Sequence, residues 1–127
     1  MTIPDSHRDL LERPLFGHLA QLRPDGRLQS NPVWFRWDGT HLRLTTTSDR
    51  QKGRNAVADP RVALSVHDPD QPYRYLEVRG EVEAIEPDPD GAFFDVLARR
   101  YQLPYDGLPD APRRVVLVIA PHSASWQ

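Results

Sequence analysis

Residues 15–47 read LFGHLAQLRPDGRLQSNPVWFRWDGTHLRLTTT, and two turn motifs divide this stretch. In Pro24-Asp25-Gly26, proline presets φ near about −65°, the aspartate side chain can accept a backbone N–H, and glycine tolerates a positive φ. Asp38-Gly39 has the same turn chemistry. The segments between the turns are rich in the large apolar residues that are typical of strands. We therefore predict three antiparallel strands, over residues 15–22, 28–37 and 41–47.

The pattern changes period after this meander. Ser48 or Asp49 can cap a short helix, and Asp88-Pro89-Asp90 opens an amphipathic helix that runs through Tyr101. Gly80 is expected to mark a bulge in the longest strand. The other predicted elements are helices over residues 7–13, 50–58 and 88–101, strands over residues 61–67, 73–86 and 113–120, and a tail over residues 121–127. Six mostly antiparallel strands with bends in one domain, residues 1–127, predict a mainly β fold with short helices, closed or nearly closed into a barrel.

Composition narrows the class of protein. The chain has 127 residues, a hydrophobic share of 39 % and a mean hydropathy of −0.62, so further apolar area could be buried between subunits of a homodimer. The net charge of −2 gives no basic field for nucleic acid or an anionic membrane. There is no cysteine, which excludes disulfides and thiolate chemistry. No apolar run approaches the length of a membrane span, and we expect a soluble, cytoplasmic protein.

Most catalytic signatures are missing from the sequence. There is no glycine-rich phosphate loop and no Gly-x-Ser-x-Gly elbow. The five histidines, at positions 7, 18, 41, 67 and 122, lack the spacing of metal ligands, so no metal site is expected. Hydrolase and metalloenzyme functions are therefore weakly supported, and no catalytic side chain can be assigned.

One polar segment, residues 45–55, has the composition of an anion site. Thr45, Thr46, Thr47 and Ser48 bring four hydroxyls to the end of a predicted strand and the start of a predicted helix. The same segment carries three cations, Arg50, Lys52 and Arg54, and Lys52 is the single lysine of the chain. Hydroxyls, helix N-terminal amides and cations are the groups that bind a phosphate ester. The alternative is a polar helix start with solvated cations, not all of which would point the same way.

A second segment, Ser30–Phe35, contains a proline within a predicted strand. Proline lacks the N–H of the ladder, so Pro32 marks an edge or a bulge. The free backbone groups there could meet the hydrogen-bonding edge of a flat heterocycle, with Trp34 as a wall. The alternative is an aromatic core cluster with Trp37, and for Trp37 itself we favour that interpretation.

Taken together, these segments resemble the split β-barrel flavin-binding superfamily of pyridoxamine 5′-phosphate oxidase, in particular its small actinobacterial branch of coenzyme F420-dependent enzymes. The match covers nearly the whole chain, and its specificity comes from the order and spacing of the segments. The matching segments are Pro24-Asp25-Gly26-Arg27, Asn31-Pro32-Val33-Trp34-Phe35, Asp38-Gly39, Lys52-Gly53-Arg54-Asn55, Asp59-Pro60-Arg61-Val62-Ala63-Leu64-Ser65 and Pro72-Tyr73-Arg74-Tyr75-Leu76-Glu77-Val78-Arg79-Gly80.

The resemblance implies a six-stranded split barrel that forms a homodimer, with two equivalent cofactor sites at the interface. It implies a role in cofactor binding for twelve residues of this chain. Those at the phosphate and ribityl chain are Lys52, Arg50, Arg54, Thr45 and Thr46, with Asn55 helping to hold that loop. Those along the ring are Asn31, Pro32, Val33 and Trp34, while Tyr73 and Trp126 would reach the site from the partner subunit.

The chain also departs from the vitamin B6 oxidase that gives the family its name. That enzyme has an arginine where Asn31 stands here, and a C-terminal extension for which this chain is too short. The resemblance therefore favours an F420-dependent oxidoreductase that transfers hydride from the reduced deazaflavin to a conjugated planar small molecule. The alternatives are an FMN-dependent oxidoreductase on the same fold and a non-catalytic dimer that binds a flavin or a tetrapyrrole.

Overall fold

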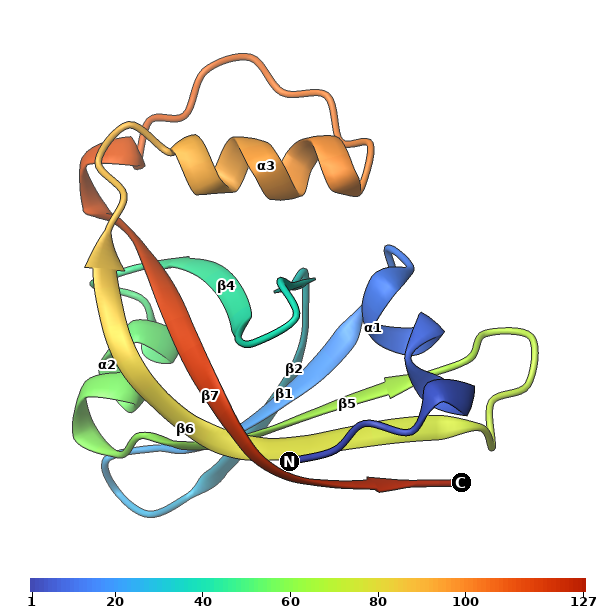
Figure 1. The fold of residues 1–127 in the computed structure, drawn as a ribbon. Helices are drawn as coiled ribbons and strands as arrows, with labels where there is room; N and C mark the ends of the chain where they lie inside the picture. Colours follow the sequence, from blue (N-terminus) through green and yellow to red (C-terminus); the bar gives the residue numbers. More distant parts are fainter.

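A computed structural model describes all residues from 1 to 127 and shows one antiparallel sheet curled around a core (Figure 1). The sheet has seven strands in the order β2-β1-β5-β6-β7-β4-β3. No helix is long and apolar enough to cross a membrane. The strands are β1 (Gly17–Leu22), β2 (Leu28–Val33), β3 (Arg36–Trp37), β4 (Leu42–Thr47), β5 (Arg61–His67), β6 (Tyr75–Pro87) and β7 (Arg114–Trp126). The α-helices are α1 (Asp9–Glu12), α2 (Gln51–Ala58) and α3 (Ala92–Arg100), and two short 3₁₀ turns cover Asp5–His7 and Ala111–Arg113.

The concave side of the sheet holds the hydrophobic core. Alternate residues of the strands point inward, as in β5, where Val62, Leu64 and Val66 are buried while Arg61 and His67 are exposed. Phe35, Leu44, Leu76 and Leu117 belong to the same buried cluster. Figure 1 shows β6 and β7 curving together along their length, with α3 across one end of the sheet. The predicted mainly β split barrel is confirmed, with seven strands in place of six.

The additional strand arises because the expected single strand over residues 28–37 is broken. The chain leaves the ladder after Val33 and returns only for β3. At the break, the Phe35 ring is fully buried, and the backbone N–H of Phe35 donates to the Tyr101 hydroxyl at 3.1 Å. The Phe35 carbonyl accepts from Arg100 Nε at 3.1 Å. Because side chains from α3 satisfy this backbone, the sheet does not have to.

The expected tail over residues 121–127 is also wrong, since β7 continues to Trp126. Its last residues pair with the first half of β6, where Leu76 lies opposite Trp126. The register shifts between Arg79 and Gly80, which confirms the predicted bulge at Gly80. The long, bent β6 would otherwise expose an unpaired edge along residues 76–79, and the end of the chain covers it.

The helix starts agree with the sequence only in part. The predicted helix over residues 88–101 begins later than expected, at Ala92, with Gly91 at the cap position. Asp88 still bonds to its first turn, because both carboxylate oxygens accept from the Phe93 N–H, at 3.3 and 3.1 Å. For α2 the expected cap is wrong, because Arg50 occupies the cap position and no side chain bonds to the first turn. The first predicted helix, over residues 7–13, is reduced to a 3₁₀ turn followed by the four residues of α1.

Candidate functional site

The end of β4 and the start of α2 place several unused hydrogen-bond donors side by side. Thr46 and Thr47 are only 2 % and 1 % exposed, and neither hydroxyl has a hydrogen-bond partner. In the first turn of α2, the N–H groups of Gln51, Lys52 and Gly53 bond to no backbone or side-chain acceptor, because the first amide that closes on the helix is that of Arg54. Leaving buried hydroxyls without a hydrogen bond is costly in free energy. This corner, formed by the end of β4 and the start of α2, is therefore suited to a ligand that presents hydrogen-bond acceptors.

Gly53 allows α2 to approach β4 this closely. A Cβ at this position would lie 2.6 Å from the carbonyl oxygen of Thr47 and 3.3 Å from that of Ser48. Both contacts are to backbone, which cannot swing away as a side-chain end could. A glycine here therefore keeps the strand end and the helix start in contact.

The three cations of the segment have different surroundings. Arg50 pairs with Asp110 at 3.0 Å, and Arg54 donates to the Asp49 carbonyl at 2.6 Å and to Gln51 Oε1 at 2.5 Å. Lys52 is half-buried and forms no ion pair. Burial lowers the pKa of the Lys52 amine below its usual value of 10.5, and the nearby charge of Arg50 lowers it further. Of these three cations, Lys52 is thus the one whose charged group has neither an ion-pair nor a hydrogen-bond partner.

Arg114 is a neighbour of the site that the sequence did not single out. It is 6 % exposed, its Nε and NH2 groups pair with both oxygens of Asp110 at 3.0 and 3.1 Å, and NH1 donates to Thr45 Oγ1 at 3.3 Å. Hydrogen bonding from Arg114 is the main reason that the pKa of Asp110 is lowered. Nothing in the sequence distinguishes Arg114 from the other 14 arginines, because its importance comes from its burial beside β4.

The second predicted segment lies on an open edge of the sheet. β2 is the first strand in the sheet order and pairs only with β1, where Pro32 lies opposite His18. This confirms the edge position that the proline indicated. Trp34 follows the strand and stacks on Tyr101, with ring centroids 5.2 Å apart and planes at 13°, while Phe94 lies 6.0 Å away. Trp37 packs separately, against the hydrophobic core, as favoured from the sequence.

A group of side-chain amides joins the two predicted segments. Asn55 is fully buried, and its Nδ2 donates to Gln29 Oε1 at 3.3 Å and to Gln21 Oε1 at 3.4 Å. Gln51 Nε2 donates to Asn55 Oδ1 at 2.7 Å, and Gln29 Nε2 donates to Asn31 Oδ1 at 2.7 Å. Asn31 and Asn55 were predicted from the sequence as site residues, whereas the three glutamines carry no signal in the sequence, because their role depends on the neighbours that the fold gives them.

Two predicted site residues lie far from this corner within one chain. Tyr73 is 87 % exposed in the loop before β6, and Trp126 is 48 % exposed at the end of β7. Trp126 lies ten positions along β7 from Val116, which pairs with Thr45, a path of roughly 30 Å along a strand. A single chain does not bring Tyr73 or Trp126 to Lys52.

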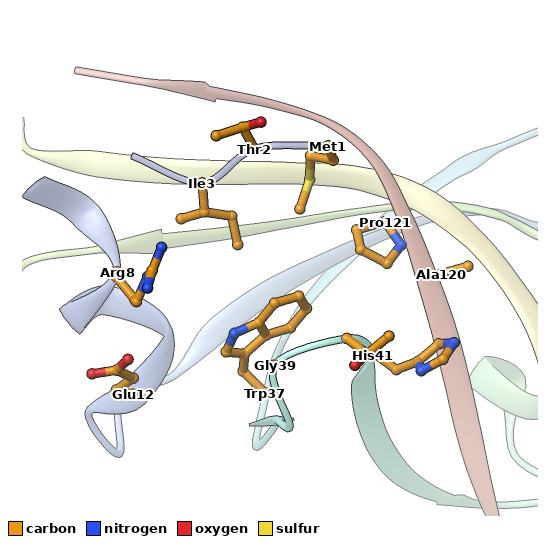
Figure 2. Close-up of a pocket in the computed structure, with 11 residues that line it drawn as sticks. Met1, Thr2, Ile3, Arg8, Glu12, Trp37, Gly39, His41, Ala120 and Pro121 are labelled. Atoms are coloured by element: carbon orange, nitrogen blue, oxygen red, sulfur yellow. The ribbon is translucent and has the colours of Figure 1, made fainter. Parts of the chain in front are cut away.

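A separate hollow lies between the N-terminus, the β3–β4 turn and the middle of β7 (Figure 2). It measures about 780 Å³ and contains none of the predicted site residues. In Figure 2, Ile3, Met1 and Pro121 lie above the Trp37 indole, and His41 lies beside it near Ala120. The His41 imidazole contacts Glu83.

A curled antiparallel sheet of this order, with a donor-rich helix start after β4, defines a split β-barrel. The chain belongs to the pyridoxamine 5′-phosphate oxidase family, whose model matches residues 3–125. This family is one of flavin-binding, oxidoreductase-like proteins.

Solved structures agree with this membership. A structure named F420 Reductase is 55 % identical, has a TM-score of 0.93, and the match covers 97 % of this chain and 98 % of that one. A conserved hypothetical protein from Mycobacterium tuberculosis is 25 % identical, with a TM-score of 0.73 over 100 % of this chain and 86 % of that one. General Stress Protein 26 from Bacillus anthracis is 20 % identical, with a TM-score of 0.72 and coverages of 94 % and 88 %, and shows the fold alone. No curated protein matches significantly.

Proposed function

We propose that this protein is a coenzyme F420-dependent oxidoreductase that reduces a conjugated, planar small molecule. The observation that carries the proposal is the half-buried Lys52, which has no counter-ion and lies at a helix start with three unpaired amides. The structure named F420 Reductase supports the choice of cofactor, because it is 55 % identical over nearly the full length of both chains.

The donor set fits a phosphate ester. The Lys52 ammonium supplies compensating charge, the first-turn amides of α2 supply directed donors, and the buried Thr46 hydroxyl supplies another. Arg50 lies close enough to affect Lys52, but Asp110 already pairs with it. We therefore assign the main phosphate contact to Lys52 and a supporting role to Arg50, whereas Arg54 holds the helix start.

The edge strand and the aromatic group after it fit a flat ring. Asn31, Pro32 and Val33 offer the polar groups of an open strand edge, and Trp34 offers an apolar wall that its stacking on Tyr101 makes rigid. When bound, the reduced deazaflavin supplies a hydride from C5 of its ring; the substrate gains that hydride and a proton, and the cofactor is oxidised.

Tyr101, which stacks on the proposed ring wall Trp34, is not the donor of the proton that the substrate gains. The Tyr101 hydroxyl donates to the Leu15 carbonyl at 2.7 Å, and burial raises its pKa above the usual value. We propose water or Tyr73 as the donor.

We further propose that the functional unit is a homodimer formed through the convex face of the sheet. On β1 and β5 this face carries small side chains, among them Ala20, Ala63 and Ser65, and the neighbouring strand β6 presents Glu77 and Arg79 beside them. Leu28 at the border of the face is 82 % exposed. A shallow hollow of about 420 Å³ on this face is lined by Ala20, Leu28 and Ala63, with the charged side chains of Arg61, Arg79 and Glu81 around them. In such a dimer, Tyr73 and Trp126 of one subunit complete the site of the other.

The variant Ala63→Arg tests the dimer. Light scattering should give about twice the 14.6 kDa chain mass for the wild type and the single chain mass for the variant, because a buried guanidinium without a partner opposes association. F420 affinity should fall with the dimer. Ala92→Arg adds the same charge on the exposed face of α3 and should change neither. A dimeric Ala63→Arg variant with wild-type affinity would contradict this assignment of the interface.

Parallel fluorescence titrations with F420 and with FMN test the cofactor. We expect micromolar or tighter binding of F420 and weaker binding of FMN, followed by turnover of planar acceptors such as quinones or enones. Preference for FMN would assign the chain to the FMN-dependent enzymes of this fold. Tight binding without turnover of any quinone, enone or tetrapyrrole would indicate a carrier. Failure to bind either cofactor would overturn the phosphate site around Lys52.

A further inference from the structure

The side-chain amides between α2 and β2 form a hydrogen-bonded network. Two contacts outside the network set which amide groups donate and which accept. Gln21 Nε2 donates to the backbone carbonyl of Lys52 at 3.2 Å, and a carbonyl can only accept. Gln51 Oε1 accepts from the Arg54 guanidinium at 2.5 Å, and a guanidinium can only donate. These two contacts are independent, and each fixes which end of its glutamine is oxygen and which is nitrogen.

Asn55, the buried residue at the centre of the amide network, passes on this donor-to-acceptor direction. Because Gln21 presents its oxygen to Asn55 and Gln51 presents its nitrogen, both require Asn55 to donate through Nδ2 and to accept through Oδ1. Asn55 Nδ2 also donates to Gln29 Oε1, which leaves the nitrogen of Gln29 as the donor to Asn31 Oδ1. Gln21 and Gln51 therefore require the same orientation of the Asn55 amide. Gln29, on β2, in turn sets the orientation of the Asn31 amide.

The geometry points to Gln29 as a positioning residue that makes Asn31 a hydrogen-bond donor. The oxygen of the Asn31 amide is occupied by Gln29, whereas its nitrogen has no partner within the chain. Asn31 lies half-buried on the open edge strand β2. Its free N–H group selects a ligand that presents an acceptor, such as a ring carbonyl, and disfavours one that presents only donors.

The inference rests on the proposed function for the identity of the ligand. The pyrimidinedione ring of a deazaflavin carries two carbonyl oxygens on its edge and so has the acceptor that Asn31 requires. Because the chain of amides starts at the backbone of Lys52, it also ties the orientation of Asn31 to the helix that is proposed to hold the phosphate. Gln29 itself bonds to Asn31 and Asn55 and not to Lys52, so its replacement should affect the ring end of the ligand and not the phosphate end.

A double-mutant cycle on Gln29 and Asn31 tests this role. In fluorescence titrations with F420, we expect Gln29→Met to raise Kd about fivefold and Asn31→Ala about tenfold. The double variant should bind no more weakly than Asn31→Ala, because Gln29 acts through Asn31. Affinity for inorganic phosphate, followed by the amide signal of Lys52 in NMR spectra, should stay the same in Gln29→Met. Gln71→Met, which alters an exposed side chain in a loop, is the matched control and should bind as the wild type does.

The outcomes separate the inference from the proposed function. Additive effects in the cycle, or an unchanged Kd for Gln29→Met, would overturn the positioning role while F420 binding by the wild type stands. If the wild type binds no F420, the proposed function fails, and NMR of the ligand-free protein still decides the inference. There the side-chain amide protons of Gln29 should exchange with water more slowly than those of Asn31. Equal exchange at the two amides would contradict the assigned direction.

Discussion

Lys52→Ala should bind F420 roughly 10- to 150-fold more weakly than the wild type, which corresponds to about 1.5–3 kcal/mol for a charge-assisted hydrogen bond. The reason is that the Lys52 ammonium has no partner within the chain, whereas Asp110 pairs with Arg50, and the Asp49 carbonyl and Gln51 hold Arg54. The fold should be retained. An amine that is half-buried, unpaired and close to Arg50 contributes little to stability, and its removal should leave Tm unchanged or slightly higher.

Arg99→Ala is the control for Lys52→Ala. It removes one positive charge from an 82 % exposed side chain on α3 and should leave the Kd unchanged, since screening weakens distant surface charges. If both variants bind F420 as the wild type does, Lys52 is only a solvated cation. If both lose affinity equally, the effect reflects net charge and not a phosphate contact.

Gly80→Ala should destabilise the protein by about 3 kcal/mol and lower Tm by roughly 10 °C. A Cβ at this position would lie 2.1 Å from the carbonyl oxygen of Ala120 and 3.0 Å from the Cα of Pro121. Both atoms belong to the backbone of β7, so relief requires the two longest strands to separate at their bend. Because β6 and β7 form the centre of the sheet, the whole barrel should lose stability cooperatively.

Gly107→Ala separates this steric effect from the ordinary cost of replacing a glycine. Gly107 has a φ of +78° but open space around it, so alanine there should cost roughly 1 kcal/mol of backbone strain alone. Urea unfolding of both variants measures the difference. Equal losses in the free energy of unfolding would show that β6 and β7 adjust at the bend, and that Gly80 is not needed for close approach.

Local patterns in the sequence were sufficient for most of the strands. The turns at Pro24-Asp25-Gly26 and Asp38-Gly39, and the bulge at Gly80, follow from backbone preferences of one or two residues. The break after Val33 does not, because it depends on Tyr101 and Arg100 bonding to Phe35 from 65 or more residues away. The continuation of β7 to Trp126 has the same character, since a bent partner strand makes pairing favourable there.

The candidate site was predictable to the extent that it is continuous in sequence. Residues 45–55 bring hydroxyls, amides and Lys52 together because a strand end is followed at once by a helix. The sequence could not show that Arg50 is paired with Asp110, because that contact spans 60 residues. The burial of Arg114 and the role of Gln29 were equally hidden, since hydrogen-bond direction depends on which amides the fold brings together.

By itself, the sequence determined the strand-rich class, the turns, the family resemblance and the donor-rich segment around Lys52. These depend on the intrinsic properties of neighbouring residues, which act over a few positions. Only the tertiary structure decided which cation is left without a partner, which hydroxyls are buried without a bond, and which atom of Asn31 is free. Those properties depend on desolvation and on pairing between distant segments, and neither exists until the sheet has curled around its core.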